Sequence, residues 1–475
     1  MALPQRIAIV GGGISGLAAA RRARELDPSA ELTLFEAAGQ LGGILQTVRR
    51  AGFLIERSAD SFITNTPWAI ELCRRIGFDQ QLLPTNADRR AFIVCRGKLQ
   101  PVPRGFTLLA PSRLGPILKT PILSPWGKLR LLCEYFVPAR RSAQGTDETL
   151  ASFARRRLGK QAFERLVQPL VGGIYTADPE QLSLAATLPR FLEMERKHGG
   201  LIRGVRADRT TTEDGLASDE ASGARYSMFV APREGMSSLV QALADSISAL
   251  RVRLNSPIGR LARDAEGRWQ LPLEGAPQPE VFDRLIIATP VGAAARLLRE
   301  LQPALASELA AIELASSAIV CVAYRQEQFS QPLAGFGFVV PSIERRSLLS
   351  VSYASLKYPG RAPEGTVLLR VFFGGALQPQ MAEQSDAELL AATQRELADL
   401  LGVRGDPLLH EVARWPNAMP QFHLGHVERV ERIGALAAGL KHFGLASNAF
   451  YGVGIPHCVR SGQFAAEQAC AGPCR

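Results

Sequence analysis

The chain has 475 residues, more than a single hydrophobic core usually serves, so we expect two or three structural units. Apolar residues make up 46% and charged residues 21% of the sequence, a globular balance that excludes a largely disordered chain. The net charge of +10 favours anionic partners, such as acidic lipid headgroups or a carboxylated substrate. We expect no nucleic-acid partner, because the sequence contains no basic run interleaved with aromatic residues and no zinc-finger signature.

Cysteine content and hydropathy bear on where the protein works. The 7 cysteines are odd in number and mostly isolated, which fits a reducing compartment better than a disulfide framework. The sequence has no apolar run long enough for a spanning helix, and a buried strand beginning by Arg6 argues against a signal peptide. We therefore expect a cytoplasmic protein, or one that lies on the cytoplasmic face of a membrane.

The start of the chain predicts a strand, a helix and a second strand. Residues 6–10 are a short apolar run, and an alanine-rich helix is expected from Ile14 to about Leu26. The second strand should end at Glu36. This βαβ order is typical of a dinucleotide-binding fold.

The rest of the chain mixes strands and helices. Short strands and turns are expected over 77–105, and helices broken by prolines over 105–200. Residues 207–225 are polar and poor in large apolar side chains, which predicts a mobile loop. The later predicted elements are a helix at 235–247, strands at 251–255, 284–290, 316–325, 335–341, 347–354 and 366–374, a helix at 385–401 with a capping box, and a strand, glycine-rich turn and final helix over 442–469.

The turn after the first strand has the composition that a dinucleotide requires. In its G-x-G-x-x-G spacing, the first glycine allows a tight turn, the second lets the backbone approach a pyrophosphate, and the third lets the helix pack on the strand. An acidic residue at the end of the next strand accepts hydrogen bonds from ribose hydroxyls. This full context outweighs the alternative of an incidental α/β turn. The predicted contacts are Gly11, Gly12, Gly13, Ser15, Gly16 and Glu36.

A second glycine pair separates FAD from a nicotinamide cofactor. Gly42 and Gly43 follow Glu36, and Thr47 comes shortly after them. The pair allows another close backbone approach to the diphosphate-flavin part of a dinucleotide, which a plain nicotinamide dehydrogenase does not need. The pattern resembles the FAD-dependent amine-oxidase superfamily, and the resemblance implies bound FAD.

Longer blocks resemble one branch of this superfamily, the protoporphyrinogen oxidase family. They are GFLIERSADSFIT at 52–64, PLVGGIYTADPEQLSL at 169–184, WPNAMPQFHLGH at 415–426 and YGVGIPHCVRSGQFAAEQ from 451. The resemblance implies oxidation of protoporphyrinogen IX to protoporphyrin IX in haem biosynthesis. Hydride would pass to FAD, and dioxygen would reoxidise the flavin to give hydrogen peroxide. A coproporphyrinogen III oxidase of the same family, or a carotenoid or amine desaturase-type flavoenzyme, remains an alternative.

The resemblance also implies an α/β fold in three parts. These are a discontinuous Rossmann-like FAD-binding domain at 1–86, 228–294 and 425–475, a mixed-sheet substrate-binding domain at 87–100 and 295–424, and a helical subdomain at 101–227. The helical part mixes large apolar residues such as Trp126 with Arg and Lys, which suits an anionic membrane surface. The residues alone slightly favour amphipathic helices that face the core. The family's peripheral membrane habit tips the expectation toward membrane contact.

Further cofactor contacts follow from the resemblance. They are Ser58, Ala59, Asp60, Ser61, Ile258, Asn448, Val453, Gly454 and Ile455. Backbone donors at the start of the final helix also suit the edge of a flavin that gains negative charge on reduction. Cys458 lies in the region where monoamine oxidases tether their flavin, but it is usual at this position in relatives that hold FAD non-covalently. We therefore interpret Cys458 as a packed helix residue and expect non-covalent FAD.

The resemblance points to three substrate contacts. Gly173 would lie against the macrocycle near the flavin, and Phe372 would pack on a pyrrole ring. Many relatives place an arginine, able to meet a substrate propionate, at the position of Ala91, so Arg90 is the candidate substitute by a one-residue shift. The histidines show no ligand spacing, so we predict no metal site, and we assign no residue a catalytic role. A homodimer remains open.

Overall fold

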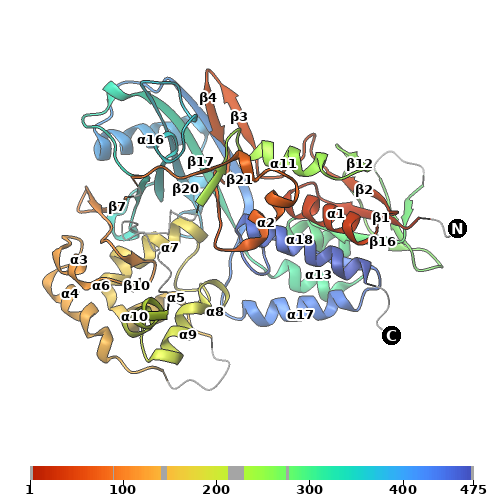
Figure 1. The fold of residues 1–475 in the computed structure, drawn as a ribbon, viewed down its shortest axis with the longest axis horizontal. Helices are drawn as coiled ribbons and strands as arrows, with labels where there is room; N and C mark the ends of the chain where they lie inside the picture. Colours follow the sequence, from red (N-terminus) through yellow and green to blue (C-terminus); the bar gives the residue numbers. More distant parts are fainter. Residues whose placement is uncertain (1–3, 89, 141–146, 212–228, 274–277, 472–475) are drawn as a thin grey trace.

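The computed structural model describes residues 4–88, 90–140, 147–211, 229–273 and 278–471. Two large sheets and a group of helices organise this part of the chain (Figure 1). In Figure 1 the five-stranded sheet lies on the side of the two termini, the seven-stranded sheet lies at the upper left, and the helical group lies below it. The predicted α/β class is confirmed.

The five-stranded sheet is parallel and is covered by helices on both faces. Its order is β12 (Leu250–Arg253), β2 (Glu31–Phe35), β1 (Arg6–Val10), β16 (Arg284–Ile287) and β22 (Phe443–Leu445). One face packs on α1 (Ile14–Leu26), α11 (Met236–Asp245) and α18 (Ile455–Cys470). The other packs on α12 (Val291–Leu298), α13 (Pro303–Ala310) and α17 (His426–Ala438). Burial on both faces explains why the strands β1, β16 and β22 are almost continuously apolar, whereas the edge strand β12 keeps two arginines.

The seven-stranded sheet is mixed. Its order is β21 (Leu409–Pro420), β17 (Leu314–Arg325), β20 (Thr366–Gly374), β19 (Ser350–Tyr353), β18 (Gly337–Val339), β7 (Ala91–Cys95) and β8 (Lys98–Pro101). Strands were predicted at β17 to β20, and all four are present. The edge strand β21 was not predicted, because Pro416 and Pro420 interrupt its pattern; edge strands tolerate proline since one side of their backbone stays unpaired.

A capped helix packs beside this sheet. In α16 (Asp386–Leu401), the Ser385 hydroxyl accepts a hydrogen bond from the Glu388 amide at 3.3 Å. The Glu388 carboxylate accepts one from the Ser385 amide at 2.8 Å. The capping box predicted from the sequence is therefore confirmed.

The helical subdomain comprises the described residues between 101 and 211. Its α-helices of four or more residues are α3 (Leu114–Lys119), α4 (Pro125–Leu132), α5 (Leu150–Leu158), α7 (Gln168–Tyr175), α8 (Leu184–Thr187), α9 (Pro189–His198) and α10 (Leu201–Thr211). The loop predicted over 207–225 begins later than expected, because α10 continues to Thr211; no glycine or proline interrupts the segment between Gly204 and Gly215. The rest of that prediction lies outside the described residues. None of the described helices is long and apolar enough to cross a membrane.

A buried ion cluster joins the helices of this subdomain. The side chains of Arg157 on α5 and Glu134 are both 0% exposed and pair with each other. Arg157 also lies 3.3 Å from Glu195 on α9. The Glu134 carboxylate accepts hydrogen bonds from the amides of Leu201, at 2.8 Å, and Ile202, at 3.1 Å, at the start of α10. Four separate segments therefore share one buried charge network.

Replacing Arg157 should destabilise the protein strongly. Arg157→Met removes the cation and leaves Glu134 buried without its partner, so we expect a loss of about 3–5 kcal/mol in the free energy of unfolding. Arg155→Met is the matched control on the same helix. Its ion pair with Glu180 is exposed, so its loss should cost about 1 kcal/mol or less. Urea unfolding followed by circular dichroism measures both, and equal effects would contradict the role of the buried cluster.

Candidate active site

One large cavity begins at the carboxyl ends of the parallel strands and extends into the helical subdomain. Its volume is about 1460 Å³. Val10, Phe35 and Ala288, at or just beyond the ends of β1, β2 and β16, form part of its wall. Cavities for single drug-sized ligands occupy roughly 300–1,000 Å³, so this one has room for a dinucleotide and a second molecule. Ligands of open α/β sheets bind at this edge.

The first turn places backbone against the cavity without side chains. Gly11 has φ +109°, a conformation that favours glycine. A Cβ atom on Gly16 would overlap the carbonyl oxygen of Gly11, so α1 can start directly above β1 only with glycine there. Gly11, Gly13 and Ser15 line the cavity, whereas Gly12 and Gly16 do not belong to its wall. The structure therefore separates two kinds of glycine in this motif.

Glu36 lies immediately after β2 and lines the cavity. Its carboxylate accepts hydrogen bonds from the amides of Gly12, at 2.7 Å, and Ala38, at 2.8 Å. These bonds fix the orientation of the carboxylate. An ionised carboxylate has about four acceptor positions, so capacity remains for the hydroxyl groups of a ribose.

The second glycine pair lies beside the first turn. Gly42 forms a parallel bridge with Gly13, and its amide donates to the Gly12 carbonyl at 2.9 Å. Gly42 and Gly43 both have positive φ and both line the cavity. The two turns together make a surface of backbone atoms, which suits the close approach of a pyrophosphate.

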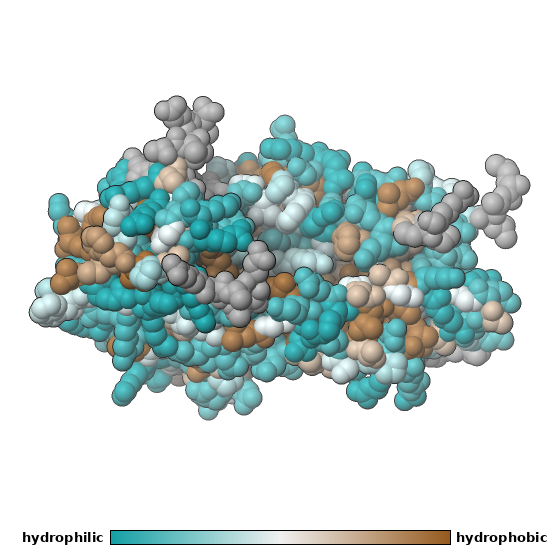
Figure 2. All heavy atoms as spheres, turned by 90° about the horizontal axis from the view of Figure 1, so that it is seen from below, coloured by the Kyte–Doolittle hydropathy of each residue, from teal (hydrophilic) through white to brown (hydrophobic). Residues whose placement is uncertain are grey.

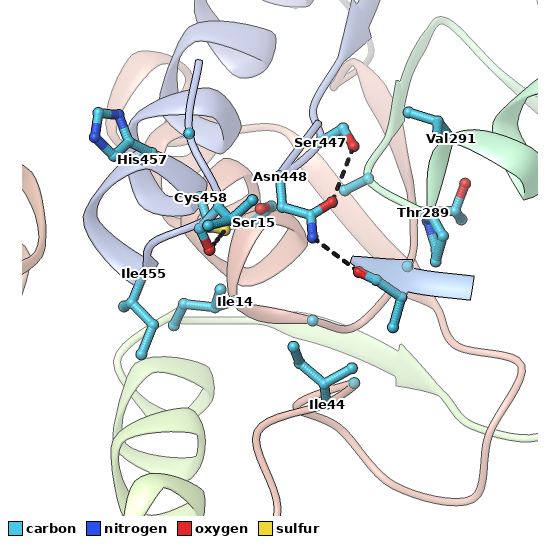
Figure 3. A pocket seen from close by; sticks show the side chains of 18 of the residues that line it. Ile14, Ser15, Ile44, Thr289, Val291, Ser447, Asn448, Ile455, His457 and Cys458 are labelled. Carbon is cyan, nitrogen blue, oxygen red and sulfur yellow. Dashed lines mark hydrogen bonds between the residues drawn. The ribbon is translucent and has the colours of Figure 1, made fainter. Parts of the chain in front are cut away.

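The C-terminal segment closes another side of the cavity (Figure 3). Asn448, Val453, Gly454 and Ile455 all belong to the wall, and α18 begins at Ile455, so its positive end faces the cavity. Cys458 is buried one turn along this helix, and burial raises the pKa of its thiol to about 12. The thiol therefore stays protonated near neutral pH.

The segment 58–61 reaches the cavity with alternate residues. Ala59 and Ser61 line it, whereas Asp60 is buried behind it, 2.9 Å from the Lys357 amine and 3.1 Å from the Arg370 guanidinium. Burial alone would raise the pKa of Asp60, but these two cations hold it well below its usual range. Asp60 thus anchors the segment and does not belong to the wall.

Of the two remaining predicted cofactor residues, one lines the cavity and one lies behind its wall. Ile258 lines the cavity. Ser58 does not; its carbonyl oxygen accepts a hydrogen bond from Arg370. Sequence reasoning missed Thr289, which lines the cavity and whose buried hydroxyl has no hydrogen-bond partner among the described residues. Its signal was a polar residue two positions after the end of the apolar strand at 284–287.

The structure brings none of the three predicted substrate residues into the described wall. Gly173 is exposed on α7, while its neighbours Ile174 and Tyr175 line the cavity. Phe372 is half-buried on β20, and the Arg370 guanidinium lies 5.1 Å from the centre of its ring. The roles assigned to Gly173 and Phe372 stay predictions.

Arg90 does not belong to the described wall of the cavity. Its guanidinium donates two hydrogen bonds to the Asp88 carboxylate, at 2.8 and 2.7 Å, and its side chain is half exposed. The Asp88 carboxylate also accepts from the amide of Gly335, at 2.9 Å. This local ion pair holds the Arg90 guanidinium next to Asp88, and the substrate contact assigned to Arg90 stays a prediction.

Comparison with known proteins identifies the family. Residues 14–470 match the family described as flavin containing amine oxidoreductase. The chain belongs to this family. Coproporphyrinogen III oxidases of Bacillus subtilis (strain 168) and Propionibacterium freudenreichii subsp. freudenreichii are 31% and 34% identical, and the matches cover 98% and 97% of this chain and 98% and 90% of theirs. A solved structure from Exiguobacterium sp. 255-15, provisionally named a protoporphyrinogen oxidase, matches with a TM-score of 0.85 at 30% identity and covers 98% of both chains.

Family membership makes the chain an FAD-dependent oxidoreductase. The residues of the cavity fit this cofactor. Gly13 and Gly43 leave space for the pyrophosphate, Glu36 keeps acceptor capacity for a ribose, and the unpaired Thr289 hydroxyl can bond to a polar ligand. When bound, FAD supplies the hydride acceptor, and the protein supplies position and electrostatics.

Adding one methyl group to the first turn should block FAD without disturbing the fold. Gly13 has φ −73°, which alanine adopts freely, and no atom lies within 4 Å of its expected Cβ position. We expect Gly13→Ala to weaken FAD binding at least tenfold, because the methyl group occupies space that the pyrophosphate needs. Flavin titration of the apoprotein measures the affinity, and the melting temperature of the apoprotein should not fall.

Gly434→Ala provides the matched control. Gly434 lies on α17, and its expected Cβ position is equally open. This variant should bind FAD like the unmodified chain. Normal FAD affinity in Gly13→Ala would contradict the placement of the pyrophosphate.

Proposed function

We propose that the chain oxidises a porphyrinogen in haem biosynthesis, with FAD as the hydride acceptor and dioxygen as the final electron acceptor. The observation that carries the proposal is the continuation of the cavity beyond its glycine-rich part into the helical subdomain. There Leu108, Ile174, Tyr175 and Leu188 form a mainly apolar wall, which we call the chamber. An apolar chamber that opens into the cofactor space suits a large, flat and largely apolar ring.

The relatives support coproporphyrinogen III as the preferred substrate. Both curated relatives of at least 30% identity described above carry that name. Protoporphyrinogen IX, the substrate expected from the sequence, is the second candidate, and the related Exiguobacterium structure supports it. The two substrates share the tetrapyrrole ring, and coproporphyrinogen III carries more propionate groups. Binding of the additional carboxylates therefore decides between them.

The chain's own residues position the substrate and keep water away. The Tyr175 hydroxyl donates a hydrogen bond to the Thr187 carbonyl at 3.1 Å, and burial raises its pKa to about 12, so it stays neutral near pH 7. No carboxylate from residues 101–140 or 147–211 lines the cavity, so a substrate carboxylate meets no like charge on that wall. The productive orientation then depends on ring packing and on cations.

Turnover of the two porphyrinogens tests the proposal. The purified holoenzyme should convert coproporphyrinogen III to the fluorescent porphyrin with a kcat/KM at least tenfold above that for protoporphyrinogen IX. An oxygen electrode should record matching dioxygen consumption. The reverse ratio would select protoporphyrinogen IX. Failure to oxidise either compound by a protein that retains FAD would reject the proposal.

We also propose that the helical subdomain contacts an anionic membrane surface. Trp126 and Phe136 are each 79% exposed, and Leu118, Leu129 and Tyr135 are also exposed. We call these five residues the apolar face. Figure 2 shows hydrophobic side chains gathered at the left end of the molecule, where α3 and α4 lie. Lys119 and Lys128 flank them, a combination that suits acidic headgroups.

Vesicle binding tests whether the apolar face contacts a membrane. The protein should pellet with anionic vesicles, and added salt should weaken the electrostatic part of binding. A Trp126→Ser and Phe136→Ser double variant should lose most of the bound fraction, because it removes the two most exposed apolar side chains. Leu26→Ser, which removes an exposed leucine at the end of α1, is the control and should leave binding intact. Equal pelleting with and without vesicles would contradict membrane contact.

A further inference from the structure

The helical subdomain contributes one cation to the described wall of the cavity, next to the residues of the chamber. Among the described residues 101–140 and 147–211, those that line the cavity are uncharged except Arg190. Arg190 is the second residue of α9, and the first turn of this helix contains no acidic residue. The positive end of the helix dipole therefore adds to the charge of the guanidinium.

The other arginines of the cavity belong to its opposite part. Arg260, Arg296 and Arg299 lie near α12 on the five-stranded sheet, together with Ile258. Their position beside the dinucleotide-binding sheet places them with the cofactor part of the cavity. Arg190 is the cation that the helical subdomain contributes.

The Arg190 guanidinium lines the cavity beside one aromatic ring. It lies 4.5 Å from the centre of the Phe191 ring, and that ring is buried, so the guanidinium rests on a fixed apolar support. Its charge also acts on the Tyr175 hydroxyl in the chamber wall, where it partly offsets the effect of burial on the pKa of that group. Arg190 therefore lies beside the segment that the sequence associates with the macrocycle.

We propose that Arg190 binds a propionate carboxylate of the porphyrinogen and thereby sets the orientation of the ring in the chamber. This inference rests on the proposed function. A carboxylate that enters an apolar chamber loses its hydration, and a paired cation compensates for that loss. Arginine suits this task because its planar guanidinium binds both carboxylate oxygens at once and so fixes direction as well as position. Arg190 is thus a substrate-binding residue that limits which edge of the ring faces inward.

Neutralised substrates provide the test. For the holoenzyme, Arg190→Gln should raise the KM for coproporphyrinogen III at least tenfold, equivalent to about 1.4 kcal/mol of binding free energy. With the methyl ester of the same porphyrinogen, which carries no carboxylate charge, the variant and the unmodified chain should have the same KM. Arg190→Lys should recover part of the lost affinity, because it keeps the charge but not the bidentate geometry.

Arg196→Gln is the matched control. Arg196 is exposed in the last turn of the same helix and does not line the cavity, so both KM values should stay unchanged. Unchanged flavin content and melting temperature in Arg190→Gln would exclude a folding defect. An equal rise in KM for the acid and the ester would overturn the carboxylate role. A rise for the acid with Arg90→Gln but not with Arg190→Gln would overturn it as well.

Porphyrin binding separates this inference from the proposed function. Coproporphyrin III, the stable product, can be titrated against flavin fluorescence without turnover. We expect the unmodified enzyme to bind the acid more tightly than its ester, and we expect Arg190→Gln to remove that difference. This result would support the carboxylate role of Arg190 even if the enzyme oxidises no porphyrinogen. If Arg190→Gln still binds the acid more tightly than the ester by the same factor, Arg190 is rejected as the carboxylate partner, whether or not the enzyme turns over.

Discussion

The burial of Asp60 beside the seven-stranded sheet is the constraint on which the cavity depends. A carboxylate in that position is tolerable only because Lys357 and Arg370 contact it, and Arg370 lies on β20 of the seven-stranded sheet. The segment that carries Asp60 also supplies Ala59 and Ser61 to the cavity wall. A shift of this segment against the seven-stranded sheet would separate these charges inside the protein, so the ion pairs fix the position of the segment at the cavity wall.

The cavity wall has two distinct parts. Around the first turns it is backbone. A side chain at Gly13 or Gly43 would enter the space that a pyrophosphate needs, whereas a side chain at Gly11 or Gly42 would collide with the protein's own backbone. In the helical subdomain it is made of side chains, mostly apolar. The first part suits a ligand held by main-chain groups and a helix terminus, and the second suits a ring held by packing. One continuous space thus joins two modes of recognition.

Local sequence patterns predicted the elements that local physics determines. The turn from Gly11 to Gly16, the position of Glu36 and the capping box at Ser385 each depend on residues close in the sequence, and each has the predicted geometry. Strand β21 escaped prediction because its prolines hide an edge strand whose partner, β17, lies far away in the sequence.

The substrate part of the site was harder to predict for a related reason. Arg90 forms its ion pair two residues away, with Asp88, which a motif comparison does not weigh. Arg190 has no motif at all: it reaches the cavity because the helical subdomain folds against the sheets and turns the start of α9 toward the cofactor space. Only the tertiary arrangement reveals such a residue.

The order of strands in the parallel sheet has a consequence for biosynthesis. β1 and β2 are made first, yet their neighbour β16 and the edge strand β22 come from residues 284–287 and 443–445. Pairings of such high contact order form slowly, and until translation reaches α18 the apolar face of α1 lacks its main covering. The nascent chain therefore exposes an unfinished sheet for most of its synthesis, and it cannot enclose its cofactor until the last elements have left the ribosome.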